Sequence, residues 1–427
     1  MTTNTTFGGA RDRKDRIAIV VLCCHGIEDP LVATLILDYT LRLQQRDIGA
    51  DVLLITEEPH RRKLSAERRA ELDRAGILWS PLWYDLSGAQ FFQKFRNLFL
   101  LAWRAWSFAR GYRHRVVLGF LSMTGAYGSI LRMLWFHRFI AMNFEPHSLF
   151  MKEMGVWGPR SLKYRVIRFF ERRTMAVADD LIAPASAVID HVRSHPHHCT
   201  IHLQGVTIDV RKSQRDEVKR RTLRARLGVE NATVLFYVGK FGGIYYSAEQ
   251  YMEFIRRSCS ADPRVHHLLV TFPDQIALIR GHGAYAQLEH RITLLEPVPP
   301  EHLADYLSAA DLGVIAVPPT PSQVFRSPVK TAHYWAAGLP IIIPAGISDD
   351  WAIARDRGIG IVVKGLPDLD VDDFRRELDR YATAPQQELM EHCVRAAMEL
   401  RDTGLMVDLL EKLITSVRSD RTASGTL

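Results

Sequence analysis

The sequence predicts an α/β protein made of two Rossmann-like, doubly wound domains that face each other across a cleft. The chain has 427 residues, the length of two ordinary domains. From residue 16 onward, short β-branched runs alternate with amphipathic stretches, which is typical of parallel sheets covered by helices. A polar, basic segment near residues 205–215 interrupts this alternation and predicts the boundary between the domains.

The first series of elements spans residues 16–205. RIAIVVLCC predicts a buried strand, His25-Gly26 a turn, and PLVATLILDYTLRLQQRDIG a helix that ends at Gly49. With the next strand, ADVLLITEE, these elements form a βαβ unit, which implies a parallel sheet. Residues 61–74 predict a charged helix. Further strands are expected in GILWSPLWY, VVLGFLS, FIAMNFE and DDLIAPAS.

The second series spans residues 206–400. A linker and a surface helix are expected in GVTIDVRKSQRDEVKRRTLRARLG. Strands and helices then alternate through ATVLFYVGK, SAEQYMEFIRRSC, HHLLVTF, DQIALIRGHG, ITLLEPV, PEHLADYLSAA, LGVIAV, SPVKTAHYWAAG, LPIIIPA and GIGIVV. Residues 1–15 are expected to form a disordered tail, and residues 401–427 a C-terminal helix and tail.

The composition is that of a soluble globular protein, with 47% apolar and 24% charged residues. No apolar segment with a cleavage site follows the polar N-terminus, and the uncharged run at 116–131 is short for a membrane span. Five cysteines without metal-ligand spacing favour a reducing compartment. We therefore expect a cytoplasmic protein, either soluble or peripheral on the inner face of the cytoplasmic membrane.

Positive charge is concentrated in the first half of the chain. Residues 1–200 hold 28 Lys and Arg against 19 Asp and Glu, although the net charge of the whole chain is only +7. A basic half indicates an anionic partner. No zinc spacing, RNP-type motif or helix-turn-helix pattern points to nucleic acid, so an anionic membrane surface is the better prediction.

Residues 91–115 are the candidate membrane-binding segment. An amphipathic helix over 91–110 is followed by basic residues up to 115, a combination that interfacial helices use. One helical face is expected to hold Phe91, Phe95, Leu98, Phe99, Ala102 and Trp106. Alternatively, this helix packs on its own sheet.

Residues 326–350, RSPVKTAHYWAAGLPIIIPAGISDD, predict an anion site. Ser327 is a suitable N-cap, Pro328 suits the first helical position, and Gly338 suits the position after the helix. The free N–H groups of the first turn, Val329 included, favour an anion. Arg326 and Lys330 flank this helix start. Alternatively, Lys330 is a solvated surface lysine.

This segment resembles the nucleotide-sugar segment of glycosyltransferase family 4 enzymes with the GT-B fold, in a bacterial subgroup that reads roughly S-P-x-K…A-x-G-x-P. The matching residues are Ser327, Pro328, Lys330, Ala336, Gly338, Pro340, Gly346 and Asp349. HLADYLSAADLGVI, FYVGKFGGIYYSAEQ and FFERRTMAVADDLIAPASAVIDHV are similar to other stretches of the family. The resemblance covers residues 16–365 and rests on the order and spacing of these stretches rather than on any single motif.

The resemblance implies that Lys240, after Gly239, contacts the donor pyrophosphate. Tyr245 and Tyr246 stand where the family has a second basic residue, and Lys330 or Arg326 could supply that charge. His333 replaces a family glutamate that binds the ribose, and the partner of that glutamate falls on Phe325. His333 can still bind a hydroxyl through a ring nitrogen. Alternatively, it is a satisfied polar residue of the helix.

Two pairs of residues at strand ends are candidates in the first domain. Gly26, beside His25, allows close approach of a diphosphate, although a simple turn explains it as well. Glu145 and His147 flank Pro146 after a strand, and they could hold an acceptor hydroxyl or act as a base. Alternatively, they only stabilise the loop.

Together these features predict a glycosyltransferase that moves a sugar from a nucleotide-sugar to a glycan or lipid-linked acceptor, in cell-surface polysaccharide or glycolipid synthesis. The resemblance implies retaining transfer without metal, and no D-x-D cluster is apparent. No cofactor is expected beyond the nucleotide-sugar co-substrate. Glu145, His147 and Lys330 are the expected catalytic residues. The alternatives are a non-catalytic nucleotide-sugar-binding relative and a sugar-nucleotide epimerase of the same fold.

Overall fold

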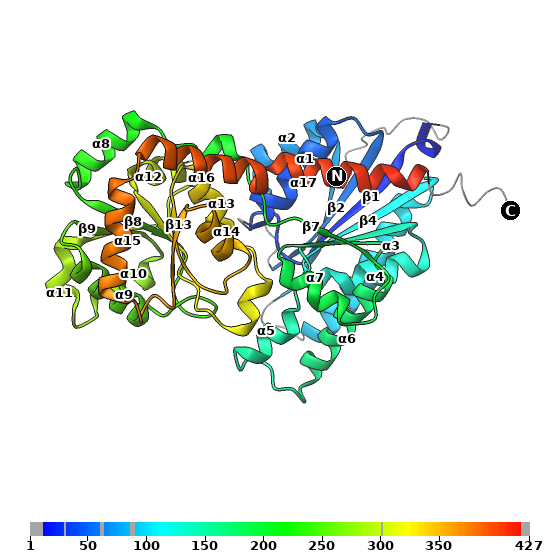
Figure 1. Ribbon diagram of the computed structural model, residues 1–427. Coiled ribbons are helices and arrows are strands. Elements are labelled where there is room, and N and C mark those ends of the chain that lie inside the picture. The colour runs from blue at the N-terminus through cyan, green and yellow to red at the C-terminus, as the bar shows by residue number, and fades with distance from the viewer. Residues whose placement is uncertain (1–11, 30, 60–63, 86–89, 300–301, 420–427) are drawn as a thin grey trace. The chain divides into compact units, whose positions relative to one another are not determined.

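The computed structural model describes residues 12–419, apart from 30, 60–63, 86–89 and 300–301. The chain divides into two compact units, each of which is considered separately (Figure 1). Unit 1 holds the residues up to 184, residues 188–204 and the residues from 404 onward. Unit 2 holds residues 185–187 and 205–403.

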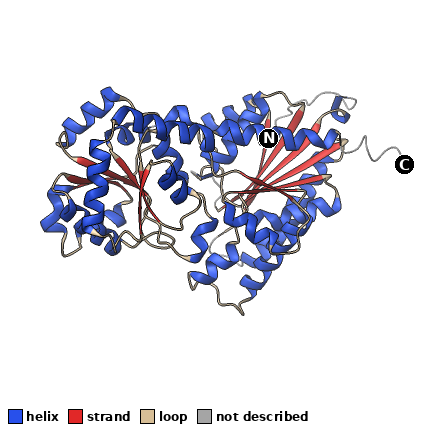
Figure 2. Cartoon of the chain, in the orientation of Figure 1, coloured by secondary structure: helices blue, strands red, loops and turns tan. Residues whose placement is uncertain are grey.

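Unit 1 is built on a parallel sheet of seven strands in the order β3-β2-β1-β4-β5-β6-β7. β-branched and apolar runs form these strands because both faces of the sheet are covered by helices (Figure 2). All seven residues of β1, for example, are buried. The strands are β1 Ile17–Cys23, β2 Ala50–Glu58, β3 Ile77–Trp83, β4 His114–Phe120, β5 Arg138–Met142, β6 Asp180–Ala183 and β7 Thr200–Leu203.

The helices of unit 1 lie mostly between successive strands along the chain, as connections between parallel strands require. They are η1 Asp12–Lys14, the π-turn η2 Val32–Ile36, α1 Leu37–Gln45, α2 Ala66–Arg74, α3 Gln90–Ala109, η3 Ser122–Thr124, α4 Gly125–Leu134, α5 His147–Glu153, α6 Leu162–Val177, α7 Ser186–Arg193, α17 Thr403–Thr415 and η8 Ser416–Arg418. The C-terminal helix α17 belongs to unit 1 from Gly404 onward, and its Asp408 pairs with Arg46 (2.6 Å) just after α1.

Unit 2 repeats the pattern with a parallel sheet of six strands in the order β10-β9-β8-β11-β12-β13. Its strands are β8 Thr233–Val238, β9 Val265–Val270, β10 Ile292–Leu295, β11 Leu312–Val314, β12 Ile341–Pro344 and β13 Gly360–Val363. Its helices are η4 Val210–Ser213, α8 Glu217–Leu227, α9 Ala248–Ala261, α10 Pro273–Arg280, α11 Tyr285–Leu288, η5 Glu289–Arg291, α12 Leu303–Ala309, η7 Pro321–Phe325, α13 Val329–Ala336, α14 Asp350–Asp356, α15 Val371–Thr383 and α16 Gln386–Arg401.

Two apolar layers hold unit 2 together, one on each face of the sheet. Alternate residues of β8 point to opposite faces, so Phe236 packs with α8, α12, α13 and α16. Its neighbours Leu235 and Tyr237 pack with α9 and α15. Trp335 of α13 is fully buried in the first layer, so the sequence of α13 is fixed largely by core packing.

Both sheets reverse their strand order beside their first strand, between β1 and β4 in unit 1 and between β8 and β11 in unit 2. Ligands of doubly wound sheets bind at the carboxyl ends of the strands at this reversal. The predicted fold class of two Rossmann-like α/β domains is therefore confirmed, and the reversal defines where each unit should carry its site.

The structure departs from the predicted elements in three places. Edge strand β7 is absent from the predicted elements, because its four residues are half-exposed and carry no apolar run. The first helix begins as a π-turn at Val32 and ends before Gly49. The expected disordered tail reaches residue 15, but Asp12–Lys14 forms a 3-10 turn; residues 1–11 lie outside the described residues.

Candidate functional site

The site of unit 2 forms where β8 ends and α13 begins. Gly239 directly follows β8 and has a φ of +144°, a backbone conformation that favours glycine. A Cβ added there would lie 3.0 Å from both Cε and Nζ of Lys330. The Lys330 side chain therefore lies against the backbone of Gly239. Two residues 91 positions apart in the sequence, both predicted to bind the donor, meet at the reversal of strand order.

Aromatic rings surround the Lys330 ammonium. Its Nζ lies 4.2 Å from the ring centroid of Tyr245 and 5.4 Å from that of Tyr237. Among the described residues, no carboxylate oxygen lies within 4.0 Å of this ammonium. Burial lowers the pKa of Lys330 below the usual lysine value, and Lys240 lowers it further; Tyr245 acts in the opposite direction. Lys330 is thus a half-buried cation without an anionic partner in the described chain.

Lys240 adds a second positive charge next to Gly239. Its side chain is exposed, and its backbone carbonyl accepts a hydrogen bond from the Tyr237 hydroxyl (2.6 Å). This bond ties the turn after β8 to the strand that precedes it. Because Lys240 acts on the pKa of Lys330, the two cations share one neighbourhood.

Ser327 does not cap α13, contrary to the prediction. The helix starts one residue later, with Pro328 in the N-cap position and no side-chain cap. The Ser327 hydroxyl instead accepts hydrogen bonds from the backbone N–H of Val206 (3.0 Å) and from Arg401 Nη1 (2.6 Å). The first N–H groups of α13, those of Val329 and Lys330, accordingly receive no side-chain acceptor from Ser327.

The remaining predicted residues of this segment have different surroundings. Arg326 is half-buried, and its backbone N–H donates to Gln323 O (3.3 Å). Val329 packs against the core of unit 2 and can offer only its backbone to a ligand. Phe325, which the resemblance predicted to stand in place of a glutamate, is half-buried at the end of η7. Gly338 has a φ of +73° just after α13, as predicted.

His333 lies one turn after Lys330 on α13 and has a protein partner. Its Nδ1 shares a hydrogen bond of 2.9 Å with the hydroxyl of Ser213 in η4. Burial lowers its pKa to about 4, so the ring is neutral at physiological pH. The alternative that His333 is a satisfied polar residue therefore accounts for Nδ1, and only Nε2 remains for a ligand hydroxyl.

In unit 1, Gly26 is crowded by a carboxylate. A Cβ added at Gly26 would lie 2.6 Å from Oε2 of Glu58, the last residue of β2. The N–H of Ile27 donates to Glu58 Oε1 (2.9 Å). The close approach of Glu58 thus explains why a residue without a side chain stands at position 26. A carboxylate at this place also disfavours an anion. Binding of a diphosphate at His25 and Gly26 therefore stays a prediction, and the local charge does not support it.

Glu145 and His147 lie in and after the loop that follows β5, and both are half-buried. The Glu145 N–H donates to the Ser122 hydroxyl (3.0 Å), which in turn donates to the Glu145 carbonyl. His147 begins α5, and its ring packs edge-on against Trp157 with centroids 5.5 Å apart. Their roles as acceptor ligand or base stay predictions.

Sequence reasoning missed Glu171, a buried carboxylate near this loop. Its Oε1 accepts the Ser148 N–H (2.7 Å), and its Oε2 accepts the Ser148 hydroxyl. Burial raises its pKa to about 7, and Glu145 contributes to that rise. The sequence held a signal: Glu171 lies seven residues after the buried Tyr164, on the face that α6 buries.

The predicted interfacial helix exposes part of the predicted face. Phe99 and Trp103 of α3 are each 62% exposed, whereas Leu101 and Ala105 are buried. Leu98, Ala102 and Trp106 are half-buried, and the side chains of residues 91 and 95 lie outside the described part of the chain. The helix therefore packs on its own sheet and also presents two large aromatic side chains.

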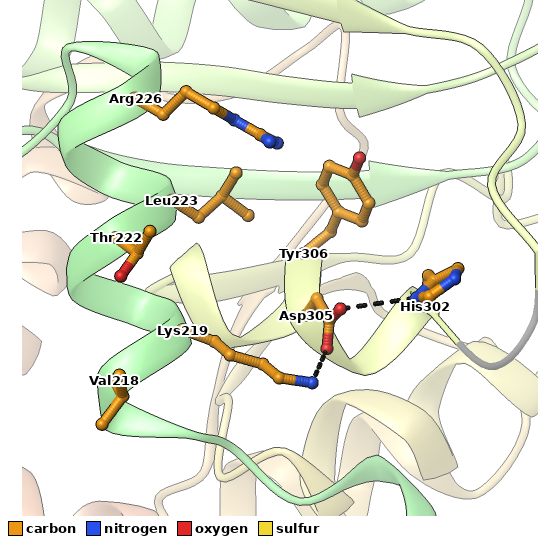
Figure 3. A pocket seen from close by; sticks show the side chains of 8 residues that line it. All are labelled: Val218, Lys219, Thr222, Leu223, Arg226, His302, Asp305 and Tyr306. Carbon is orange, nitrogen blue, oxygen red and sulfur yellow. Dashed lines mark hydrogen bonds and ion pairs between the residues drawn. The ribbon is translucent and has the colours of Figure 1, made fainter.

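A pocket of about 280 Å³ lies apart from these residues, between α8 and α12 of unit 2 (Figure 3). Its Asp305 pairs with Lys219 (2.5 Å) and His302 (3.6 Å), so its carboxylate is neutralised within the pocket. None of the residues predicted from the sequence lines it.

No group of three or more His, Cys, Asp or Glu side chains in the described part of the chain is placed to hold a metal ion. None of the helices formed by the described residues has the length and apolar character needed to cross a membrane.

The chain shares its fold with several glycosyltransferases of known structure. Sucrose-phosphate synthase from Thermosynechococcus elongatus is 18% identical, with a TM-score of 0.69 over 95% of this chain and 100% of its own. HepE from Anabaena in complex with UDP-glucose is 13% identical, with a TM-score of 0.65 over 94% and 99% of the two chains. WaaG, a glycosyltransferase involved in lipopolysaccharide biosynthesis, is 13% identical, with a TM-score of 0.62 over 93% and 99%.

Identities this low show the fold alone. No protein-family model and no curated protein matches the chain.

Proposed function

We propose that this protein is a glycosyltransferase that transfers a sugar from a nucleotide-sugar to a glycan or lipid-linked acceptor. One observation carries the proposal: Lys330 holds a half-buried positive charge, without a carboxylate partner among the described residues, against the backbone of Gly239 at the reversal of strand order. A desolvated cation is costly unless a ligand supplies the counter-charge. The donor diphosphate is such an anion.

The chemistry follows from the charge that develops. In the transfer step the anomeric carbon exchanges its bond to the diphosphate oxygen for a bond to the acceptor oxygen. The acceptor proton leaves to a base, and negative charge accumulates on the departing diphosphate. Lys330, Lys240 and the first N–H groups of α13 would stabilise that charge, which is electrostatic catalysis. No metal is required in this scheme, and we propose that the configuration of the sugar is retained.

The nucleotide base and the acceptor class are further parts of the proposal. HepE binds UDP and UDP-glucose, so uridine nucleotides are the first donors to test. His333 would contribute one hydrogen bond to the ribose through Nε2. Glu145 and His147, in unit 1, are proposed to contact the acceptor, and a role in the synthesis of a cell-surface polysaccharide or glycolipid would fit a lipid-linked acceptor.

A panel of UDP-, GDP-, ADP- and CMP-sugars tests this function. The purified protein is incubated with each donor, and free nucleotide is quantified by mass spectrometry with thermal-shift binding alongside. Slow hydrolysis of one donor and matching stabilisation are expected. Lys330→Ala should keep the fold and lower turnover at least a hundredfold, on the order of 3 kcal/mol, whereas Lys212→Ala, at an exposed lysine, should have no effect. Equal turnover in the Lys330 variant and the parent would refute this role.

A non-catalytic nucleotide-sugar-binding protein is the second candidate. Two observations favour it: Phe325 cannot bind a ribose hydroxyl, and Nδ1 of His333 is committed to Ser213. Binding of one nucleotide-sugar without release of nucleotide, also in the presence of lipid extracts, would select this function. Failure of every nucleotide to bind would reject both candidates.

A further inference from the structure

The turn that carries Tyr245 is rigidly held. Gly242 and Gly243 have φ values of +79° and +63°, and the Gly242 N–H donates to Tyr246 O (2.8 Å). The Tyr246 N–H donates to the carbonyl of Ala316, just after β11 (3.2 Å). Its hydroxyl accepts the N–H of Leu366 (3.3 Å). These bonds fix the backbone on both sides of the Tyr245 ring, so the ring is a platform with a defined position.

The Lys330 ammonium lies over this platform. The 4.2 Å between Nζ and the ring centroid is well within the range of a cation–π contact, and Tyr237 offers a second, more distant ring. The Tyr245 hydroxyl also interacts with the ammonium and favours its charged form. A carboxylate in this place would hold the lysine equally well but would neutralise it. An aromatic ring holds the cation and leaves its charge available for an anion.

We propose that Tyr245 is the positioning residue of this site: its ring and hydroxyl hold the Lys330 ammonium against Gly239, where the diphosphate of the donor binds. This inference rests on the proposed function for its ligand. The geometric part of it, that Tyr245 sets the position and charge of Lys330, is independent of the ligand. Tyr245 itself makes no contact with the reacting atoms in this scheme.

A double-mutant cycle tests the functional part. The probe is whichever of UDP, GDP and ADP binds the parent best, measured by titration calorimetry. Tyr245→Leu, which removes the ring, should weaken binding about tenfold, on the order of 1.4 kcal/mol. Tyr245→Phe, which keeps the ring, should lose less than threefold. In a Lys330→Ala background, Tyr245→Leu should have no further effect, because the residue it positions is gone.

The control is Tyr285→Leu, at a half-buried tyrosine on α11 before the edge strand β10, which should bind the nucleotide like the parent. An equal loss from Tyr245→Leu in the presence and absence of Lys330 would show a merely structural role and overturn the proposal. Unchanged affinity in Tyr245→Leu would overturn it as well.

A second measurement needs no ligand and separates this inference from the proposed function. The lysines are labelled by reductive ¹³C-methylation, the Lys330 signal is assigned from its absence in Lys330→Ala, and it is titrated by NMR. Tyr245→Leu and Tyr245→Phe should both lower the pKa of Lys330, because each removes the hydroxyl that favours the ammonium. An unchanged titration would overturn the proposal. If no nucleotide binds the parent but the titration shifts, the proposed function fails and the positioning role stands.

Discussion

Lys330 is half-buried without a carboxylate partner in the described chain, so it should work against the stability of its own unit. Its lowered pKa means that the folded protein binds fewer protons here than the unfolded chain, between the folded pKa and the usual lysine value near 10.5. The penalty is therefore complete below the folded pKa and is relieved as the pH rises through that window.

We therefore predict that removing the charge of Lys330 raises the stability of the protein and abolishes its function. Lys330→Met keeps the length of the side chain and removes the charge, so it should stabilise the free protein by about 1 kcal/mol while abolishing nucleotide binding. Thermal denaturation at pH 7.5 measures the first effect and calorimetry the second. Lys240→Met, at an exposed position, should leave the stability unchanged. A lower melting temperature for Lys330→Met would contradict the account of Lys330 as a strained cation.

Glu171 gives a prediction for the pH dependence of stability. Its pKa rises from 4.5 to about 7 on folding because its carboxyl group is buried. A raised carboxyl pKa stabilises the fold below pH 4.5, and this contribution is lost as the pH rises through 7. At about 1.4 kcal/mol per pKa unit, the parent should lose about 3 kcal/mol relative to Glu171→Gln between pH 4.5 and 8.

Urea denaturation at a series of pH values measures this difference. Asp190→Asn, at an exposed carboxylate on α7, should keep the pH dependence of the parent. Parallel curves for the parent and Glu171→Gln would show that Glu171 stays charged in the folded protein, held by its two hydrogen bonds from Ser148.

Residues of the site differ in how far the sequence could reveal them. Lys330 was predicted from a local pattern, a lysine at a helix start, whereas Gly239 was predicted from the family resemblance of the turn after its strand. Their meeting depends on the strand order and could not be read from either pattern. Glu58 was missed, and the contact of Tyr245 with Lys330 was not foreseen, for the same reason: a buried carboxylate against Gly26 and a ring under a lysine are tertiary contacts. Ser327 was misread because Arg401, 74 residues away, takes its hydroxyl.

The turn after β8 is the element in which a substitution should disturb the site most. An alanine at Gly239 would adopt an unfavourable φ and would press its Cβ against Lys330 at 3.0 Å and the Tyr237 hydroxyl at 3.1 Å. We expect Gly239→Ala to cost about 2 kcal/mol of stability and to lower nucleotide affinity at least tenfold. Gly228→Ala provides the match: φ is +66° but the space is open.

Gly228→Ala should therefore cost about 1 kcal/mol, with nucleotide affinity unchanged. Urea denaturation and calorimetry on the two variants separate backbone strain from displacement of Lys330. Equal affinities in both variants would show that the close approach of Gly239 and Lys330 has no functional role.

Helix α16 is joined to the start of α14 by a buried ion pair and to the residue before α13 by a hydrogen bond. Arg401, at the end of α16, pairs with Asp350 at the start of α14, and their side chains are 4% and 0% exposed. Arg401 also donates to Ser327, and Gly205 leaves room for its guanidinium. Burial raises the pKa of Asp350, and Arg401, with the Thr331 hydroxyl, opposes that rise, so Arg401 supplies the positive charge that favours the carboxylate.

Arg401→Met should therefore destabilise the protein by about 4 kcal/mol, because Asp350 would remain buried without a counter-charge. Arg357→Met breaks an exposed pair with Glu399 on the same helix and should cost less than about 1 kcal/mol. Denaturant unfolding of both variants gives the comparison. Similar losses in the two variants would contradict the account of the buried pair as a joint between elements.

Most elements of the fold were predictable because long apolar runs and glycine or proline boundaries are local signals. β1, β2, β8 and β12 are fully or nearly fully buried strands with apolar runs at their centres, although β2 also holds buried polar residues such as Asp51 and Glu57. β7 was not predictable, because a four-residue edge strand buries little and its pairing with β6 alone defines it. The π-turn at Val32 could not be predicted either, since its hydrophobic pattern is that of an ordinary helix.

At the scale of the whole molecule, the uneven charge and the exposed apolar side chains of unit 1 belong together. Residues 1–200 carry the excess of Lys and Arg. Within this unit, α3 and α6 both contact α4, and all three expose large apolar residues. These are Phe99, Trp103, Met133, Leu134, Leu162, Val166 and Phe169. Basic residues of α6, such as Arg165 and Arg172, are exposed beside them.

This combination predicts binding to an anionic bilayer, because aromatic side chains insert at the headgroup level while Lys and Arg attract anionic lipid. The protein should sediment with vesicles of phosphatidylglycerol and phosphatidylcholine at low salt, and be released at 0.5 M salt, as expected of a screened attraction.

The double variant Trp103→Glu and Phe169→Glu should lose at least tenfold in vesicle affinity, because it removes the inserting side chains and adds two negative charges. Phe272→Glu, at a 49% exposed phenylalanine of unit 2, adds the same kind of charge elsewhere and should sediment like the parent. If both variants sediment equally, the attraction arises from net charge alone and the aromatic residues of α3 and α6 do not enter the bilayer; a parent that stays in the supernatant removes the membrane from the proposal altogether.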